Sequence, residues 1–273
     1  MGNVNKIIYG QSFDDYLALR GEHYSSIKEL RRSPLHYKSR VRPSDSDALR
    51  VGRAIHAYVL DPGNANVVQF DGRRFGKSWD EFKAAHSGAV ILKPDDLQEV
   101  AAMHDSVAMH PHARSWLVDG DGEITCQFEL DGILFKARID WLSSDGVLVE
   151  LKTTRDVHPH AFEREYARRL YHAQAALYWM GLRECGVEVV GVCCIAVDKN
   201  APHEVVVYRI GQEALEAGSR LVFGWIARLK ECRASGVWPG IDGGKVLDLK
   251  IPDWALLEGL PDVEMEDGDG DEG

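Results

Sequence analysis

Two neighbouring stretches of the chain alternate between apolar and polar residues with the period of a β-strand. In residues 133–141 every second residue is apolar, and Asp140 is among the polar positions. Residues 147–152 repeat this alternation, with Glu150 and Lys152 on the polar side. The connecting Ser-Asp-Gly is typical of a three-residue hairpin loop with glycine in the left-handed conformation. The pattern therefore predicts an antiparallel pair of strands that carries two carboxylates and a lysine.

The register of these strands decides whether the charged side chains share one face of the sheet. Asp140 and Glu150 point the same way only when the numbers of paired residues sum to an even value, which a three-residue loop produces. A third alternating stretch precedes the pair, and the Asp-Gly turn after it favours pairing of Leu130 with Ile133. Counting back from that turn places Glu123 opposite Asp140. We therefore expect three carboxylates and a lysine to converge on one face.

Charged groups on apolar strands need an explanation, because burying a charge costs free energy unless it pairs or binds a metal ion. Carboxylates that hold Mg²⁺ beside a lysine suit the hydrolysis of a phosphodiester, since the ion screens the negative phosphate and acidifies bound water. The alternative is a solvated sheet face, which antiparallel sheets commonly present. We expect that alternative for Lys136 and Glu129. For Asp140, Glu150 and Lys152 together, the strongly apolar flanks favour a catalytic site.

Further candidate residues lie on predicted helices. Residues 49–60 have helical apolar spacing and include His56. Gln174 and Tyr178 lie four residues apart on one face of a second predicted helix, residues 171–184. Taken singly, a helical histidine is more often a packing residue than a metal ligand, and the Gln/Tyr pair is an ordinary polar stripe. Their significance depends on where the fold places them relative to the carboxylates.

The remaining pattern predicts a single α/β domain over residues 1–261. We expect a central mixed β-sheet of about five strands flanked by helices. The N-terminal part, residues 1–110, is expected to be a helical elaboration, and residues 111–261 to form the catalytic core. The other predicted elements are strands over 189–197 and 204–208 and helices over 79–86, 94–109, 159–168 and 212–234.

Charge is distributed unevenly along the 273 residues, whose formal net charge is −11. Residues 262–273 hold seven acidic and no basic residues, and we expect them to be a disordered tail. Residues 20–53, in contrast, carry nine Lys/Arg against four Asp/Glu. We expect this basic stretch to bind DNA phosphates. Its predicted contacts are Arg31, Arg32 and Arg53, with the nearby serines Ser26 and Ser33.

The cysteines and the N-terminal residues indicate which cellular compartment and which kind of metal site to expect. The five cysteines, at positions 126, 185, 193, 194 and 232, form no Cys-x-x-Cys pair, so we expect reduced core residues and no tetrahedral zinc site. Residues 1–20 are polar and mixed, unlike a signal peptide, and no apolar run is long enough to span a membrane. These features favour a cytoplasmic protein.

The order of these features resembles the RecE and RecB type of exonuclease in the PD-(D/E)xK superfamily, close to the phage and prophage recombination exonucleases such as lambda exonuclease. The resemblance spans residues 24–254, and the ordered set of motifs is specific where no single motif is. The matching pieces are Ser-Pro-Leu-His-Tyr at 33–37, Gly-Arg-Ala-Ile-His at 52–56, Arg-Ile-Asp at 138–140, Glu-Leu-Lys-Thr-Thr at 150–154, His-Ala-Gln-Ala-Ala-Leu-Tyr at 172–178 and Trp-Pro at 238–239.

The resemblance implies a role for each matching residue. Asp140, Glu150 and the Leu151 carbonyl would bind metal ions, with His56 and Glu123 at the same site. The implied cofactor is Mg²⁺, with Mn²⁺ as an alternative, at two ions per site. Lys152 would orient or help deprotonate the attacking water and offset charge on the phosphorus. Thr153, Gln174 and Tyr178 would support the site and the DNA strand.

The resemblance also implies an activity and partners. The expected enzyme is a DNA exonuclease that digests linear duplex from 5′ ends and leaves 3′ single strands for recombination. A homo-oligomeric ring (a trimer or a tetramer) around duplex DNA and a single-strand annealing recombination protein are the implied partners. The alternatives are an endonuclease or repair nuclease with the same core, and a non-catalytic DNA-binding module.

Overall fold

A computed structural model describes residues 4–41, 46–256 and 258 of the chain. The predicted acidic tail, residues 262–273, lies outside the described residues. The division into one domain over 1–261 stays a prediction. Among the described residues, no helix is both long enough and apolar enough to cross a membrane.

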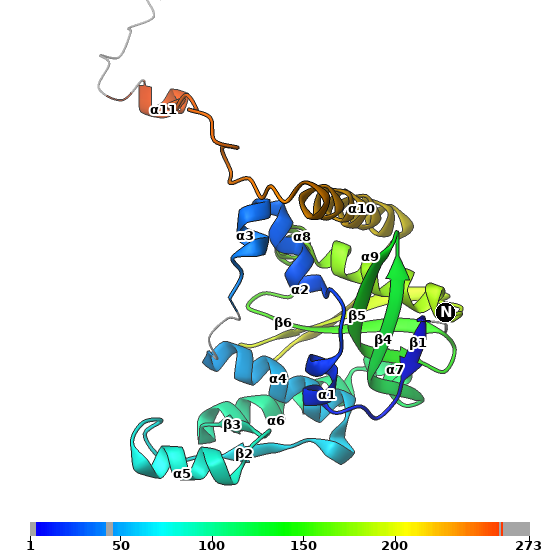
Figure 1. Ribbon diagram of the computed structural model, residues 1–273. Coiled ribbons are helices and arrows are strands. Elements are labelled where there is room, and N and C mark those ends of the chain that lie inside the picture. Colours follow the sequence, from blue (N-terminus) through cyan, green and yellow to red (C-terminus); the bar gives the residue numbers. More distant parts are fainter. Residues whose placement is uncertain (1–3, 42–45, 257, 259–273) are drawn as a thin grey trace, which may run out of the picture.

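The centre of the fold is a mixed six-stranded sheet in the order β1-β4-β5-β6-β7-β8 (Figure 1). Strands β6 and β7 are parallel, and the other neighbours are antiparallel. The predicted mixed α/β class is therefore confirmed. The sheet has one strand more than expected from the sequence, because the three residues of β1 are too few to show an alternation. The strands are β1 (Lys6–Ile8), β4 (Gly120–Leu130), β5 (Ile133–Ser143), β6 (Val147–Thr154), β7 (Gly191–Asp198) and β8 (Val205–Arg209).

Helices cover both faces of this sheet and enclose two large apolar cores, with a smaller third cluster around Phe162 and Tyr166. One core joins β4 and β5 to α9 and α10. The other joins β6 and β7 to α4, α6 and α7, which lie below the sheet in Figure 1. A separate two-stranded sheet, β2 (Val67–Gln69) and β3 (Val90–Leu92), extends the second core. The helices are α1 (Phe13–Ala18), α2 (Tyr24–Ile27), η1 (Lys28–Arg31), α3 (Pro34–Lys38), α4 (Asp47–Leu60), η2 (Pro62–Asn64), α5 (Lys77–Ala85), α6 (Pro94–Met109), α7 (Pro111–Leu117), α8 (Pro159–Arg168), α9 (Tyr171–Glu184), α10 (Gln212–Ser235) and α11 (Asp253–Leu256).

Both predicted hairpin registers are confirmed. Leu130 pairs with Ile133, and the β4–β5 pairing keeps the same register on either side of Glu123, which therefore falls opposite Asp140. Strands β5 and β6 pair Trp141 with Val149, so the residue numbers sum to an even value as expected. The loop between them ends in a glycine with a φ of +82°, the left-handed conformation that the three-residue loop requires.

Strand β5 separates from β6 soon after this hairpin. In the part of the chain that the structure describes, the two strands pair only at Trp141 and Leu142 of β5. Further along, an N-terminal segment occupies the open edge of β5. The N–H of Glu22 donates to the Leu134 carbonyl and the N–H of Lys136 donates to the Glu22 carbonyl, each at 2.8 Å. The chain before α2 thus pairs with the part of the β5 edge that β6 does not cover.

The same N-terminal segment covers the polar face of β4 and β5. The Lys136 ammonium donates to the carbonyls of Tyr16, Leu17 and Leu19 at 2.8–2.9 Å, and the residue is 5% exposed. The expectation that Lys136 lies on a solvated face is therefore wrong, because its charge satisfies carbonyls at the end of α1. Glu129 is exposed as expected.

Glu22 connects this N-terminal segment to three helices. Its carboxylate accepts hydrogen bonds from the hydroxyls of Ser26 in α2, at 2.9 Å, and Tyr37 in α3, at 2.6 Å, and pairs with Arg233 of α10 at 2.6 Å. Arg40 lies 3.7 Å away. Burial alone would raise the pKa of Glu22, but these donors outweigh it and lower that pKa.

We predict that Glu22→Gln destabilises the fold at neutral pH by roughly 1–3 kcal/mol, because the donors lose their charged acceptor. The pKa of Glu22 is lower in the folded chain than in the unfolded chain. Its stabilisation is therefore present above the unfolded pKa and disappears as pH falls through the folded pKa. Urea unfolding at pH 7 and at pH 3.5 checks this. A penalty of equal size at both pH values would contradict it.

Candidate active site

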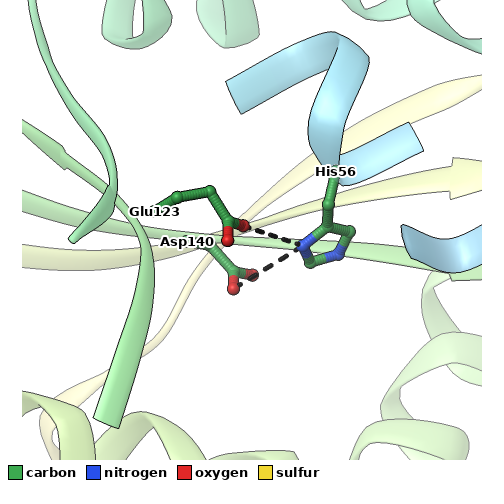
Figure 2. Close-up of side chains that lie close together, drawn as sticks. All are labelled: His56, Glu123 and Asp140. Atoms are coloured by element: carbon green, nitrogen blue, oxygen red, sulfur yellow. Dashed lines mark ion pairs between the residues drawn. The ribbon is translucent and has the colours of Figure 1, made fainter. Parts of the chain in front are cut away.

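Three elements bring together a histidine and two carboxylates. Helix α4 supplies His56, β4 supplies Glu123 and β5 supplies Asp140, and one ligand atom of each lies within 4.8 Å of the others. His56 Nδ1 is 3.8 Å from Glu123 Oε1 and 3.7 Å from Asp140 Oδ1. Figure 2 shows this ring nitrogen facing both carboxylates. The imidazole and the carboxylates, separated by 67 and 17 residues of sequence, thus form one compact group.

A hydrogen bond to the backbone fixes the orientation of His56. Its Nε2 lies 3.0 Å from the Leu151 carbonyl oxygen, which can only accept, so this nitrogen carries a hydrogen. The neutral ring then presents an unprotonated Nδ1 to Glu123 and Asp140. Burial would lower the pKa of His56, but the two carboxylates outweigh this effect and raise that pKa. A cation between the carboxylates would replace the proton that they attract.

Asp140 is fixed at the point where β5 and β6 separate. Its Oδ2 accepts the backbone N–H of Leu151 at 2.9 Å, while its Oδ1 faces His56. The residue is only 7% exposed. One carboxylate therefore holds the neighbouring strand with one oxygen and presents the other to the cluster.

Glu123 has a left-handed backbone conformation, with a φ of +53°, inside an otherwise extended strand. Its carboxylate pairs with Arg138, which also donates to the Gln11 carbonyl at 3.0 Å. Burial would raise the pKa of Glu123, but His56 and Arg138 more than offset this and lower it. The left-handed conformation of a non-glycine residue costs free energy and is typical of functional positions.

Glu150 and Lys152 form a second group beside Asp140. Lys152 Nζ lies 3.6 Å from Glu150 Oε2 and 3.7 Å from Asp140 Oδ2, so the ammonium connects the two carboxylates. The Tyr171 ring, at the start of α9, lies 5.2 Å from the same Nζ. A cation over an aromatic face is stabilised by the ring, and this contact limits the positions that the ammonium can take.

Glu150 is the least satisfied charged residue of the site. It is fully buried, and neither carboxylate oxygen has a hydrogen-bond partner among the described residues. Burial raises the pKa of Glu150 to about 7, against the lowering effect of Lys152. Its oxygens lie outside the compact group of His56, Glu123 and Asp140. A buried carboxylate without donors indicates a ligand that the protein itself does not supply.

The donor set fits a divalent cation. An imidazole nitrogen aimed at two carboxylates, with the Glu150 carboxylate nearby and without hydrogen-bond donors, provides mainly hard oxygen ligands. His56, Glu123 and Asp140 would hold one ion, and Glu150 would contribute on the other side of Asp140. The Leu151 carbonyl, expected from the resemblance to bind metal, accepts the His56 hydrogen bond in this structure and thereby orients His56. Its metal contact stays a prediction.

The structure also places Gln174 and Tyr178 against the site. Gln174 Nε2 donates to the Tyr178 hydroxyl at 3.1 Å, as their spacing on α9 allows. Tyr178 is buried, and burial raises its pKa well above the usual value, with further contributions from Tyr16, Asp140 and Glu150. Tyr178 is therefore within electrostatic range of the two carboxylates, and Gln174 is connected to them through Tyr178.

The residues predicted to contact DNA differ in how exposed they are. Arg31, Arg32 and Arg53 are exposed and Thr153 is half-buried. The two serines are 2% exposed and are used at helix starts. The hydroxyl of Ser26 accepts the His23 N–H and donates to Glu22, and that of Ser33 accepts the His36 N–H. The structure thus gives both serines capping roles, and their DNA contacts stay predictions.

Two residues of the site do not appear among the predicted site residues. Arg138 precedes Asp140 by two positions, so the strand alternation already placed it on the polar face. Tyr171 begins α9 after Leu170, which has a φ of +60°. The Tyr24 hydroxyl donates to the Leu170 carbonyl at 2.6 Å and holds this turn. No sequence signal connects Tyr171 with Lys152, because their contact depends on how α8 and α9 are joined.

Comparison with known families agrees with this geometry. Residues 24–246 match the family described as "PDDEXK-like domain of unknown function (DUF3799)". The chain belongs to this family. The match covers every residue of the two charged groups, and the six-stranded mixed sheet is consistent with a PDDEXK-like nuclease fold. No curated protein matches this PDDEXK-like chain significantly.

Solved structures support the fold. The crystal structure of a "Putative exonuclease" from Eubacterium rectale is similar, with a TM-score of 0.62 at 15% sequence identity, over 93% of this chain and 99% of that chain. At this identity the likeness shows the fold alone. The crystal structure of SSO0001 aligns with a TM-score of 0.28 at 14% identity, over 76% of this chain and 90% of that chain, which is too low to support any argument.

We predict that Glu150→Gln stabilises the metal-free protein at pH 8 by roughly 1–3 kcal/mol, because a buried charge whose desolvation Lys152 only partly offsets is removed. The folded pKa of Glu150 is raised, so its ionisation destabilises the fold increasingly as pH rises from the unfolded pKa toward about 7. Thermal unfolding in EDTA at pH 5.5 and pH 8 checks this. The exposed Asp145→Asn in the neighbouring loop is the control. A Glu150→Gln protein that melts below wild type at pH 8 would contradict the prediction.

Proposed function

We propose that this protein is a metal-dependent nuclease that hydrolyses phosphodiester bonds of DNA at the group formed by His56, Glu123, Asp140, Glu150 and Lys152. The observation that carries the proposal is the position of Asp140 between the two groups. It faces His56 with one oxygen, and Lys152 Nζ lies 3.7 Å from the other. A metal-binding arrangement and a fixed ammonium thus share one carboxylate, as phosphodiester hydrolysis requires.

The proposed cofactor is Mg²⁺, with Mn²⁺ as a substitute, at two ions per site. Bound there, the ions supply Lewis-acid chemistry, which means that they polarise a phosphoryl oxygen and acidify a water molecule. The oxygen-rich donor set supports Mg²⁺ over zinc. His56 and Asp140 are held by the backbone of Leu151, so the ligands are oriented before any ion arrives.

Lys152 is the residue that we propose acts directly on the attacking water and the phosphate. Its ammonium is held near Asp140, Glu150 and the Tyr171 ring, where it can donate a hydrogen bond to the attacking water and offset the negative charge that grows on the phosphate. Burial would lower the pKa of Lys152, but the two carboxylates outweigh burial and raise it. These carboxylates therefore favour the charged form of Lys152, which suits the role of an electrostatic donor.

We further propose that the substrate is the end of linear duplex DNA, digested from 5′ to 3′ to leave 3′ single strands for recombination in the cytoplasm. The support is the ordered motif resemblance and the similarity in fold to the Eubacterium rectale protein that is described as an exonuclease. The exposed arginines Arg31 and Arg32, on the N-terminal side of the site, are the proposed contacts for the terminal phosphate. A ring-shaped homo-oligomer and a single-strand annealing protein are the proposed partners.

Cleavage of end-labelled linear duplex in Mg²⁺ is expected to release nucleotides, to stop in EDTA and to leave closed circular duplex intact. Asp140→Asn should lower the rate by roughly 10³-fold, because it removes the charge that both groups share. The control is Asp145→Asn, which changes an exposed carboxylate in the same hairpin and should cleave like wild type. Cleavage of the circle would favour an endonuclease. Full activity of Asp140→Asn would place catalysis elsewhere.

Arg32→Ala should reduce the preference for 5′-phosphorylated over 5′-hydroxyl ends, because a terminal phosphate dianion would lose a cationic contact. The ratio of initial rates on the two substrates measures this preference. Arg220→Ala, an exposed arginine of α10, is the matched control. An unchanged ratio in Arg32→Ala would remove Arg32 from the proposed phosphate site and leave the proposed cleavage centre unaffected.

A further inference from the structure

Two cysteines that are 59 positions apart in sequence lie in direct contact. Cys126 is in the middle of β4, and Cys185 is the residue that ends α9. Their sulfur atoms are 3.3 Å apart, while both thiols are free. Strand β1 pairs with β4 at this point, with Ile7 opposite Cys126, and so borders the contact. A disulfide needs a sulfur–sulfur distance of about 2.05 Å, so only a small movement separates the contact from a bond.

The two thiols have different surroundings. Cys126 is fully buried, whereas Cys185 is partly exposed and is open to a small oxidant. Either thiol can donate in the sulfur–sulfur contact, and this contact together with the Lys6 backbone N–H lowers the pKa of Cys185 despite partial burial. The Cys185 thiol also lies 3.6 Å from the Gln127 carbonyl, to which it can donate. The pKa of Cys126 is raised by the same hydrogen bond and by burial. Because Cys185 is the more exposed of the two, we assign it as the thiol that meets the oxidant, with buried Cys126 as the resolving partner.

The other three cysteines provide a contrast. Cys193, Cys194 and Cys232 are buried, and burial raises the pKa of each. Cys193 and Cys194 are neighbours on β7, where successive side chains point to opposite faces. None of these three thiols has the combination of partial exposure, a lowered pKa and a sulfur in contact.

We propose that Cys126 and Cys185 are a reversible oxidation site, at which hydrogen peroxide converts the pair to a disulfide that joins β4 to the end of α9. The Cys185 thiolate attacks one peroxide oxygen, so that an S–O bond forms, the O–O bond breaks and the leaving hydroxide takes a proton to become water. Cys126 then attacks the sulfenic sulfur, the S–S bond forms and a second water leaves. The two sulfurs together supply the two electrons that reduce the peroxide.

The disulfide would join two elements of the nuclease core. Cys126 lies three residues after Glu123 on β4, and α9 carries Tyr171, Gln174 and Tyr178 before it ends at Cys185. The bridge would therefore close the chain between the strand and the helix that border the charged groups. Closing such a long loop restricts the unfolded chain, so the oxidised protein should have a higher melting temperature, by roughly 5 °C.

Peroxide treatment of the full chain, followed by intact-mass measurement and peptide mapping, tests the proposal. Wild type should lose two hydrogens, yield one peptide linked between positions 126 and 185, and return to the starting mass with dithiothreitol. Cys126→Ser should instead accumulate oxygen on Cys185, and Cys185→Ser should stay unmodified. The Cys193→Ser and Cys232→Ser controls should form the bridge like wild type.

Three results would overturn the proposal. They are an unchanged wild-type mass, a bridge between other cysteines, or oxygen added to Cys185 of wild type without a bridge. Melting temperature provides a second readout, since the oxidised wild type should melt higher than the reduced form. The Cys126→Ser and Cys185→Ser variants should show no such difference. None of these measurements depends on nuclease activity, so the outcome is independent of the proposed function.

Discussion

The carboxylate of Asp140 accepts the backbone N–H of Leu151 at the position where β5 separates from β6, and the site depends on this contact. Because one oxygen is held by the neighbouring strand, the other faces His56, whose own orientation is fixed by the Leu151 carbonyl. The backbone N–H and C=O of Leu151 on β6 thus orient two side chains from other elements, Asp140 of β5 and His56 of α4. The divergence of the strands gives the side chains room to enter, and the N-terminal segment closes the edge of β5 that this divergence leaves open.

This arrangement is electrostatically unfavourable without a cation. Glu150 has no hydrogen-bond donor among the residues that the structure describes, and burial raises its pKa to about 7. Lys152 offsets part of the negative charge, while Glu123 depends on Arg138 and His56. A divalent ion bound there, as proposed, would offset the cost of this buried negative charge. A fold of this size needs no buried carboxylate cluster for its stability. A functional role is therefore the better explanation for the free energy that burying these carboxylates costs.

Much of this structure could be predicted from local sequence patterns. Strand alternation and turn chemistry were enough to predict the registers that place Glu123 opposite Asp140 and Asp140 alongside Glu150, because a one-residue slip would have exposed the apolar face. The sequence could not show how residues 11–22 cover the polar face, since the partners of Lys136 are backbone carbonyls that any sequence supplies. The capping roles of Ser26 and Ser33 and the contact of Tyr171 with Lys152 also depend on tertiary packing, which has no periodic signal.

The position of a bound ion tests the central claim most directly. Anomalous diffraction from crystals grown with Mn²⁺ would locate the ion without any assumption about activity. A peak coordinated by His56 Nδ1 and by carboxylate oxygens of Glu123 and Asp140 is the result that we predict, with loss of that peak in Asp140→Asn crystals. Mn²⁺ bound only at other positions, with the His56 ring and both carboxylates unchanged and ion-free, would contradict it.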